Sequence, residues 1–417
     1  MRNDHRGGLS LVRIKNLSSV LEWLHIGGPR SRAQLAQLTG LNKSTISSLV
    51  GELINRGFIN EVGDDTSGIG RPGTILQLNP NAGWGIGVEI GVGYISIIIS
   101  NFIGEIIWRR YEDLGMITQE DEVIPRVSAL VDEAYRSCID SGGQVLGMGI
   151  TLPGLVDVNK GILVFSPNLQ WRDVPLQKIF LDQTGLTIFV DNDANAAALG
   201  EHLFGVGRKE QHFLFIVAGV GVGGGLFLNG DIYRGARGLA GEIGHTSVLI
   251  DQHKPCRCGN RGCWENTANQ SALFERVRAR LEVGRRSLIT ELLGEDNISL
   301  SLPVIKQAAE RGDSEVLEAL DETGAAIGLG VANMINIFNP EMVVIGGALS
   351  VVGEFLMPSI LKAVDERALH ANRIHTTIVL SAFRQEASAI GAAAMVIQEN
   401  MTNPTTIKPI QMQSARV

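Results

Sequence analysis

The feature that most constrains the fold of this chain is a change in residue pattern at Trp84. From there to about residue 395, short apolar runs of strand length alternate with longer segments whose apolar residues recur at helical spacing. This alternation predicts an α/β fold, because strands and helices in such an order pack as layers around a sheet. The clearest predicted segments are strands 85–89, 94–100, 105–110, 145–151, 213–218 and 342–345, and helices 123–141 and 321–338.

The segment before Trp84 has the pattern of a small helical domain. Its apolar residues recur at helical spacing between residues 10 and 62, with breaks after Gly27 and at Gly40. Ser31 and Asn42 are residue types that cap helices, so we predict that they start the second and third helices. Runs 58–62 and 74–78 flank a polar stretch and predict a hairpin. Helices followed by a hairpin indicate a winged helix-turn-helix, predicted to span residues 1–80.

The third predicted helix presents polar side chains near its start, where a helix-turn-helix contacts the major groove. Arg71 lies at the tip of the predicted wing, a position that suits a minor groove. Residues 1–80 have nine Lys and Arg against six Asp and Glu, whereas the whole chain has a net charge of −8. This basic head on an acidic body fits DNA binding by the head, although a plain helical bundle with a solvated face gives a similar pattern. The predicted DNA contacts are Asn42, Lys43, Ser44, Thr45, Ser47 and Arg71.

Three of the four cysteines fall within eight residues, at Cys256, Cys258 and Cys263. Such clustering favours a metal over disulfides in a reducing compartment. With His245 as the fourth ligand, the set predicts a closed, structural zinc site, because no coordination position is left open. His253 is a competing fourth ligand, and a set of reduced, unligated thiols is the alternative to any metal.

The remaining sequence features concern the cell compartment, the fourth cysteine and the C-terminal segment. The polar N-terminus lacks the apolar segment of a secretory signal, and the apolar runs are too short to span a membrane, so we expect a cytoplasmic protein without a membrane partner. Cys138 stands alone in a predicted helix and is expected to be a core residue. The segment 401–417 is polar, contains two prolines and is predicted to be a disordered tail.

Several motifs of the body resemble those of the ROK family, named for repressors, open reading frames and kinases, and the head resembles that of its repressor branch, with xylose-repressor, Mlc and NagC types. The resemblance implies an actin-like domain of two α/β lobes with a cleft between them, here residues 81–400, and zinc on His245, Cys256, Cys258 and Cys263. The motifs that carry it are GMGITLPGLVD (147–157), VDNDANAAALGE (190–201), GVGVGGGLFLNGDIYRGARGLAGEIGH (219–245) and CRCGNRGCWE (256–265).

The resemblance also implies a sugar site. Carboxylates and amides suit vicinal hydroxyls, and a zinc-bound imidazole keeps one nitrogen free for a hydrogen bond. Asp193 occupies the position of the family's general base. The implied sugar-binding residues are Asn168, Asn192, Asp193, Glu242, His245 and Glu265.

The phosphate loops depart from the pattern of the family's kinases. Residues 89–93 match the Asp-x-Gly-x-Thr motif of those kinases, but Glu89 replaces the aspartate and Gly93 replaces the threonine. Where those kinases have Gly-Thr-Gly, this chain has Val220 in the middle. Both hydroxyl donors to ATP are lost, and phosphoryl transfer depends on positioning and charge stabilisation, so we predict no enzyme activity.

Together these features predict a sugar-responsive transcriptional repressor. We expect it to bind an inverted-repeat operator as a homodimer or tetramer and to be released by a monosaccharide in the cleft. The alternatives are an ATP-dependent hexose kinase and a repressor controlled by a protein partner. The sequence leaves open which sugar acts, and whether it acts as inducer or co-repressor.

Overall fold

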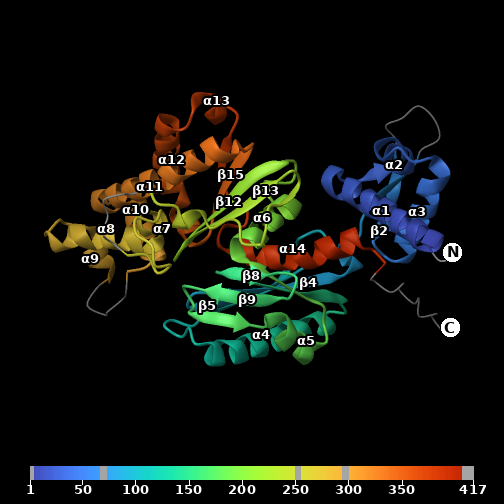
Figure 1. The fold of residues 1–417 in the computed structure, drawn as a ribbon, viewed down its shortest axis with the longest axis horizontal. Coiled ribbons are helices and arrows are strands. Elements are labelled where there is room, and N and C mark those ends of the chain that lie inside the picture. Colours follow the sequence, from blue (N-terminus) through green and yellow to red (C-terminus); the bar gives the residue numbers. More distant parts are fainter. Residues whose placement is uncertain (1–3, 66–72, 249–254, 294–299, 406–417) are drawn as a thin grey trace.

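The computed structural model describes residues 4–65, 73–248, 255–293 and 300–405, with side chains described from residue 11 and not at 64–65. Three parts are visible in Figure 1: a head at one end, and two lobes joined through the helices α6 and α14. The predicted Arg71 contact and the alternative ligand His253 lie outside the described residues. Among the described helices, none is long and apolar enough to cross a membrane.

The head has the predicted three helices and hairpin. Ser31 caps α2 through a capping box with Gln34, and Gly40 ends that helix with a φ of 68°, a conformation that favours glycine. Asn42 caps α3 by accepting a hydrogen bond from the Thr45 amide. A two-residue strand that the sequence pattern did not predict, β1, pairs with β3. The elements are α1 (Asp4–Gly27), β1 (Arg30–Ser31), α2 (Arg32–Thr39), α3 (Lys43–Asn55), β2 (Ile59–Asp65) and β3 (Gly73–Leu78).

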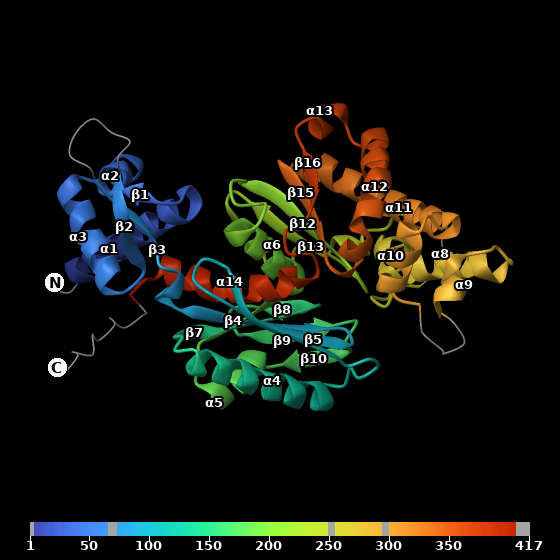
Figure 2. The same cartoon turned by 180° about the vertical axis from the view of Figure 1, so that it is seen from behind.

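The first lobe is a five-stranded sheet in the order β11-β7-β4-β5-β6, with β4, β5 and β6 antiparallel and β7 and β11 parallel to β4. Helices α4 and α5 lie on one side of this sheet and α14 on the other (Figures 1 and 2). A three-stranded sheet, β10-β9-β8, extends the lobe. The elements are β4 (Trp84–Gly91), β5 (Tyr94–Ser100), β6 (Ile106–Asp113), α4 (Glu120–Asp140), β7 (Val145–Leu152), β8 (Leu155–Asp157), β9 (Ile162–Ser166), β10 (Trp171–Val174), α5 (Leu176–Thr184) and β11 (Ile188–Asn192).

The second lobe repeats the strand order of the first. Its sheet runs β14-β13-β12-β15-β16, again with three antiparallel strands followed by two parallel ones. This duplication is the predicted two-lobed, actin-like architecture, which is confirmed. The elements are β12 (His212–Ala218), β13 (Val222–Leu228), β14 (Asp231–Ile232), α7 (Glu265–Ala268), α8 (Gln270–Glu282), α9 (Leu288–Leu293), α10 (Leu302–Glu310), α11 (Ser314–Phe338), β15 (Met342–Gly346), α12 (Gly353–Arg367), α13 (His370–Arg373) and β16 (Thr377–Leu380).

Two helices occupy the middle of the molecule, α6 (Asp193–Phe204) and α14 (Ala387–Thr402). They touch backbone to backbone, because a Cβ added at Gly391 would lie 1.9 Å from the Ala196 carbonyl oxygen. Helix α14 continues past residue 400, and Met401 is buried, so the predicted start of a disordered tail at 401 is wrong. An apolar side chain in the last turn keeps this helix packed against the core.

The head is docked on the body through a buried junction. His25 lies in the last turn of α1, and its Nε2 is 2.7 Å from the Leu203 carbonyl oxygen at the end of α6. Arg208 donates to the His25 carbonyl oxygen, and the ring of His25 meets that of Phe204 edge-on. Burial and the charge of Arg208 lower the pKa of His25 to about 4. The ring is therefore neutral near pH 7, and Nε2 carries the proton that the carbonyl accepts.

Candidate functional site

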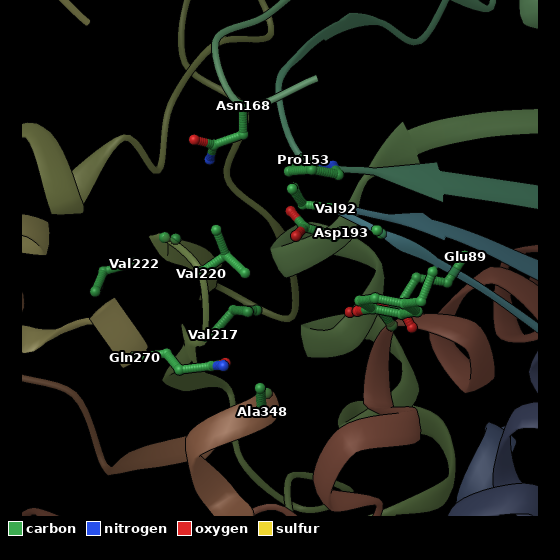
Figure 3. Close-up of a pocket in the computed structure, with 18 of the residues that line it drawn as sticks. Glu89, Val92, Pro153, Asn168, Asp193, Val217, Val220, Val222, Gln270 and Ala348 are labelled. Atoms are coloured by element: carbon green, nitrogen blue, oxygen red, sulfur yellow. The ribbon is translucent and has the colours of Figure 1, made fainter. Parts of the chain in front are cut away.

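A cavity of about 650 Å³ is lined by residues of both lobes. The carboxyl end of β11 and the start of α6 line it, together with the turn between β4 and β5 from the first lobe and the turn between β12 and β13 from the second. Figure 3 shows Asn168 and Asp193 in the upper part of this cavity, with Val220 and Gln270 of the second lobe below them. All six residues of the predicted sugar site line the same cavity.

The start of α6 places Asn192 and Asp193 at the cavity. Asn192 caps the helix, since its Oδ1 accepts from the amides of Ala194 and Asn195, and its Nδ2 donates to the Gly154 carbonyl. This side chain is therefore largely committed to holding the loop. Burial and the charge of Glu242 together raise the pKa of Asp193 to about 6. Asp193 is thus mostly ionised near pH 7 and can accept hydrogen bonds from the hydroxyls of a ligand.

On the opposite wall, Glu242, His245 and Glu265 form a connected group. Nε2 of His245 lies 3.7 Å from the Glu242 carboxylate, and Nδ1 lies 3.7 Å from that of Glu265. The Glu265 carboxylate accepts from the Val222 amide. Asn168 comes from the first lobe and accepts from Arg257 at 3.5 Å, so it faces the same group across the cavity. Two lobes thus contribute to one set of carboxylates and amides.

His245 and three cysteines form a metal-ligand set. The donor atoms of His245, Cys256, Cys258 and Cys263 all lie within 4.8 Å of one another. The Sγ atoms of Cys258 and Cys263 are 3.8 Å apart, and Cys256 Sγ is 3.7 Å from His245 Nδ1. A tetrahedral ion with bonds of about 2.3 Å to sulfur separates two sulfur ligands by about 3.8 Å. The residues therefore fit a metal that takes Nδ1 and leaves Nε2 toward the cavity.

An ion pair between a buried aspartate and a partly exposed arginine, which the sequence did not predict, joins the two walls. Arg234 donates twice to Asp191, at 2.9 and 2.6 Å, and only 3% of the Asp191 side chain is exposed. Asp191 directly precedes Asn192, and Arg234 belongs to the segment that leads to Glu242. The planar, two-bond geometry fixes orientation as well as distance. Both residues lie inside the quoted motifs, but nothing in their spacing indicated that they pair.

The charge of the cavity wall is one-sided. Five acidic side chains line it, and none of the described lining residues is Lys or Arg. The acidic residues are Glu89, Asp113, Asp193, Glu242 and Glu265. Such a wall disfavours phosphorylated ligands, because like charges repel strongly in a partly buried site. Neutral molecules rich in hydroxyls suit it, since carboxylates accept their hydrogen bonds without opposing charge.

The predicted DNA-contact residues of α3 lie at the surface. Lys43, Ser44 and Ser47 are exposed, and Thr45 is partly exposed. Asn42 uses its Oδ1 to cap the helix and to accept from the Ser44 hydroxyl, so only its amide nitrogen is left for other partners. Ser47 donates to the Lys43 carbonyl within the helix. The roles of these residues stay predictions.

Comparison with known proteins places this architecture in a family. The model of the ROK family matches residues 85–399, and that of the MarR family matches residues 18–68. The chain therefore belongs to the ROK family. The helix-turn-helix in front of its ROK domain is of the MarR type.

Among its relatives, this ROK protein is 34% identical over 399 residues to a putative xylose repressor of Caldicellulosiruptor sp., covering 95% of this chain and 99% of that relative. Among solved structures, it resembles a ROK family transcriptional regulator described as a homologue of the Escherichia coli MLC protein, with a TM-score of 0.79, 29% identity and coverage of 95% and 99%. It also resembles a ROK family glucokinase from Streptomyces griseus in complex with glucose and AMPPNP, with a TM-score of 0.69, 30% identity and coverage of 75% and 99%.

Proposed function

We propose that this ROK protein is a sugar-responsive transcriptional repressor that binds an operator through its head and is released by a monosaccharide in the cleft between the lobes. The observation that carries the proposal is the combination of a helix-turn-helix head with a cavity lined by carboxylates and amides. The repressor names of its full-length relatives support it. Its remaining alternatives, a hexose kinase and a repressor under a protein partner, make different predictions below.

The site holds a sugar through its own side chains. Asp193 accepts a hydroxyl hydrogen from one wall, and Glu242, Glu265 and the free Nε2 of His245 bind other hydroxyls from the opposite wall. The metal is zinc, one per chain, and it fixes the ring of His245 and the loop that carries Glu265. The side chains of both walls can hydrogen-bond the same sugar only when the walls are close together. Sugar binding therefore favours a more closed cleft.

Helix α6 connects this site to the head. It begins at Asp193 and ends at Phe204, where Leu203 and Phe204 contact His25. A helix of this length moves as a rigid body, so a shift of its start on sugar binding also shifts the surface on which the head is docked. In a homodimer on an inverted repeat, such a shift changes the spacing of the two α3 helices and weakens operator binding.

The zinc prediction is tested by metal analysis of protein purified without chelator, which should find close to one zinc per chain. Cys258→Ser should lower the metal content, and with it the thermal stability and the sugar affinity, because the loop that carries His245 and Glu265 loses its anchor. Cys138→Ala, at the buried cysteine of α4, is the matched control and should leave the metal content unchanged. A zinc content near zero, with Cys258→Ser as stable as wild type, contradicts the assignment.

The kinase alternative is tested by coupled assays with ATP, Mg²⁺ and a panel containing glucose, xylose, mannose, allose, fructose and N-acetylglucosamine. We expect no product above background, because Val220 and Gly93 replace the hydroxyl donors of the family's kinases and the cavity wall is acidic. Ordinary enzymes turn over about ten times per second. A turnover of that order with any of these sugars would show that Asp193 still acts as a base.

The assignment of the head is tested through the salt dependence of operator binding. Lys43→Ala should weaken binding to all sequences and reduce the salt slope by about one, the contribution of one phosphate contact. Lys362→Ala, on the exposed surface of α12 in the second lobe, is the matched control and should leave both unchanged. Equal effects of the two substitutions would remove the evidence that α3 faces DNA.

A further inference from the structure

Two stacked tyrosines line the cavity beside residues 89–93, the segment that resembles a phosphate loop of the family's kinases. Tyr94 of β5 and Tyr111 of β6 stack with ring centroids 5.5 Å apart and planes at 20°. The ring of Tyr94 lies directly on Gly91, where an added Cβ would come within 2.1 Å of it. The turn between β4 and β5 is thus covered by an aromatic ring. Tyr111 is 62% exposed, and it lines the cavity together with Tyr94.

Beside this pair, one oxygen of a buried carboxyl lacks a hydrogen-bond partner within 3.5 Å among the described residues. Glu89 is 5% exposed, and its Oε1 accepts from the Tyr94 hydroxyl at 2.6 Å. Its Oε2 has no hydrogen-bond partner among the described residues, although Glu89 lines the cavity (Figure 3). Burial raises the pKa of Glu89 to about 8, so the group is mostly neutral near pH 7 and can donate as well as accept. A buried polar atom without a partner is costly, which points to a ligand that supplies one.

One further charged group lies beside the tyrosines, since Asp113 lines the cavity and is the register partner of Tyr94 between β5 and β6. The neutral side chains of Gln270, Gln385, Ser301 and Ser388 and the apolar Val92 and Val220 also line the cavity. Amides and hydroxyls suit the hydroxyls of a carbohydrate, and an aromatic face suits the apolar C–H face of a sugar ring. A nucleotide or phosphate would instead meet the carboxylates of Asp113 and Asp193 without a cationic side chain among the described lining residues.

We propose that the Glu89, Tyr94 and Tyr111 half is a second sugar subsite, so that a glycoside of two or more linked sugar units binds more tightly than the monosaccharide that occupies the first site. The inference rests on the proposed function, because it requires that the first unit bind beside Asp193. The cavity volume of about 650 Å³ is in the range of about 300–1,000 Å³ that holds drug-sized ligands, which leaves room beyond one sugar ring. The second unit packs on the exposed face of Tyr111 and hydrogen-bonds Glu89.

Calorimetric titration of the full-length protein tests the subsite. The probes are xylose and glucose and their linked dimers xylobiose, cellobiose, maltose and isomaltose, with ADP and AMPPNP plus Mg²⁺ as anionic competitors. We expect at least one dimer to bind ten times or more tightly than its own monomer, and neither nucleotide to bind. Glu89→Gln and Tyr111→Ala should each lower the ratio of dimer to monomer affinity several-fold, whereas Asp193→Asn should lower both affinities together.

The outcomes separate this inference from the proposed function. Monomers that bind as tightly as every dimer, with ratios unchanged in Glu89→Gln and Tyr111→Ala, overturn the subsite and leave the sugar sensor intact. Nucleotide binding that is lost in Tyr111→Ala also overturns it, because the half would then be a nucleotide site. If no sugar of either length binds, the proposed function itself fails. Tyr111 is exposed, so its alanine variant is expected to fold even if Glu89→Gln does not.

Discussion

Asp193→Asn is expected to give a protein that binds its operator as tightly as wild type but is no longer released by sugar. Asparagine has nearly the same shape, so the cap of α6 by Asn192 is kept. The change removes the ionised acceptor that the sugar hydroxyl uses, and hydrogen bonds to charged groups contribute about 1.5–3 kcal/mol. A typical coupling free energy is about 1–3 kcal/mol, which corresponds to a release of roughly 5- to 150-fold. Most of that release should therefore be lost at a fixed sugar concentration.

The measurement is operator affinity by gel shift or fluorescence anisotropy, without sugar and at the one sugar concentration that just saturates the wild type. Asp182→Asn, an exposed carboxylate on α5 that pairs with Lys178, is the matched control and should leave the release unchanged. Glu242→Gln, on the opposite wall, should resemble Asp193→Asn. A full release in Asp193→Asn would show that the sugar site lies elsewhere.

His25→Ala is expected to separate sugar binding from operator release. The substitution removes the hydrogen bond to Leu203 and the ring contact with Phe204, which are two contacts between α1 and α6. The loss of a buried hydrogen bond and ring contact costs about 1–3 kcal/mol, comparable with the whole coupling free energy. Sugar should then lower the operator affinity of this variant by no more than a few-fold. Its sugar affinity, measured by calorimetry, should stay within about threefold of wild type.

The control for this variant is His370→Ala, at an exposed histidine of α13 in the second lobe, far along the chain from the junction. It should change neither sugar affinity nor release. If His25→Ala binds sugar and is released as fully as wild type, the signal reaches the head by another route. If it loses operator binding in the absence of sugar, the junction holds the head in its binding geometry rather than transmitting the signal.

The parts of this structure that the sequence predicted are those set by local chemistry. Ser31 and Asn42 are helix caps, the apolar spacing of the head marks α1 to α3, and the cysteine spacing marks the metal-ligand set. Each depends on residues that are close in the chain, or on a motif that a family shares. The two-lobed fold also followed from the alternation of strands and helices and from the family motifs.

The parts that it did not predict depend on contacts between distant segments. His25 meets Leu203 across 178 residues, and Arg234 meets Asp191 across 43, so no local pattern indicates either pair. The stacking of Tyr94 on Tyr111 depends on the register of β5 and β6, which residue types alone do not fix. The predicted tail began too early because the last turn of α14 is polar except for the buried Met401.

The central claim is that sugar in the cleft and DNA on the head are linked through one equilibrium. The most direct test is the affinity of the full-length protein for its operator, measured across a panel of free sugars and their linked dimers at a constant salt concentration. The account predicts that at least one sugar lowers operator affinity by 5-fold or more, in the typical range of coupling. An operator affinity that no sugar changes in either direction would contradict it and would favour control by a protein partner.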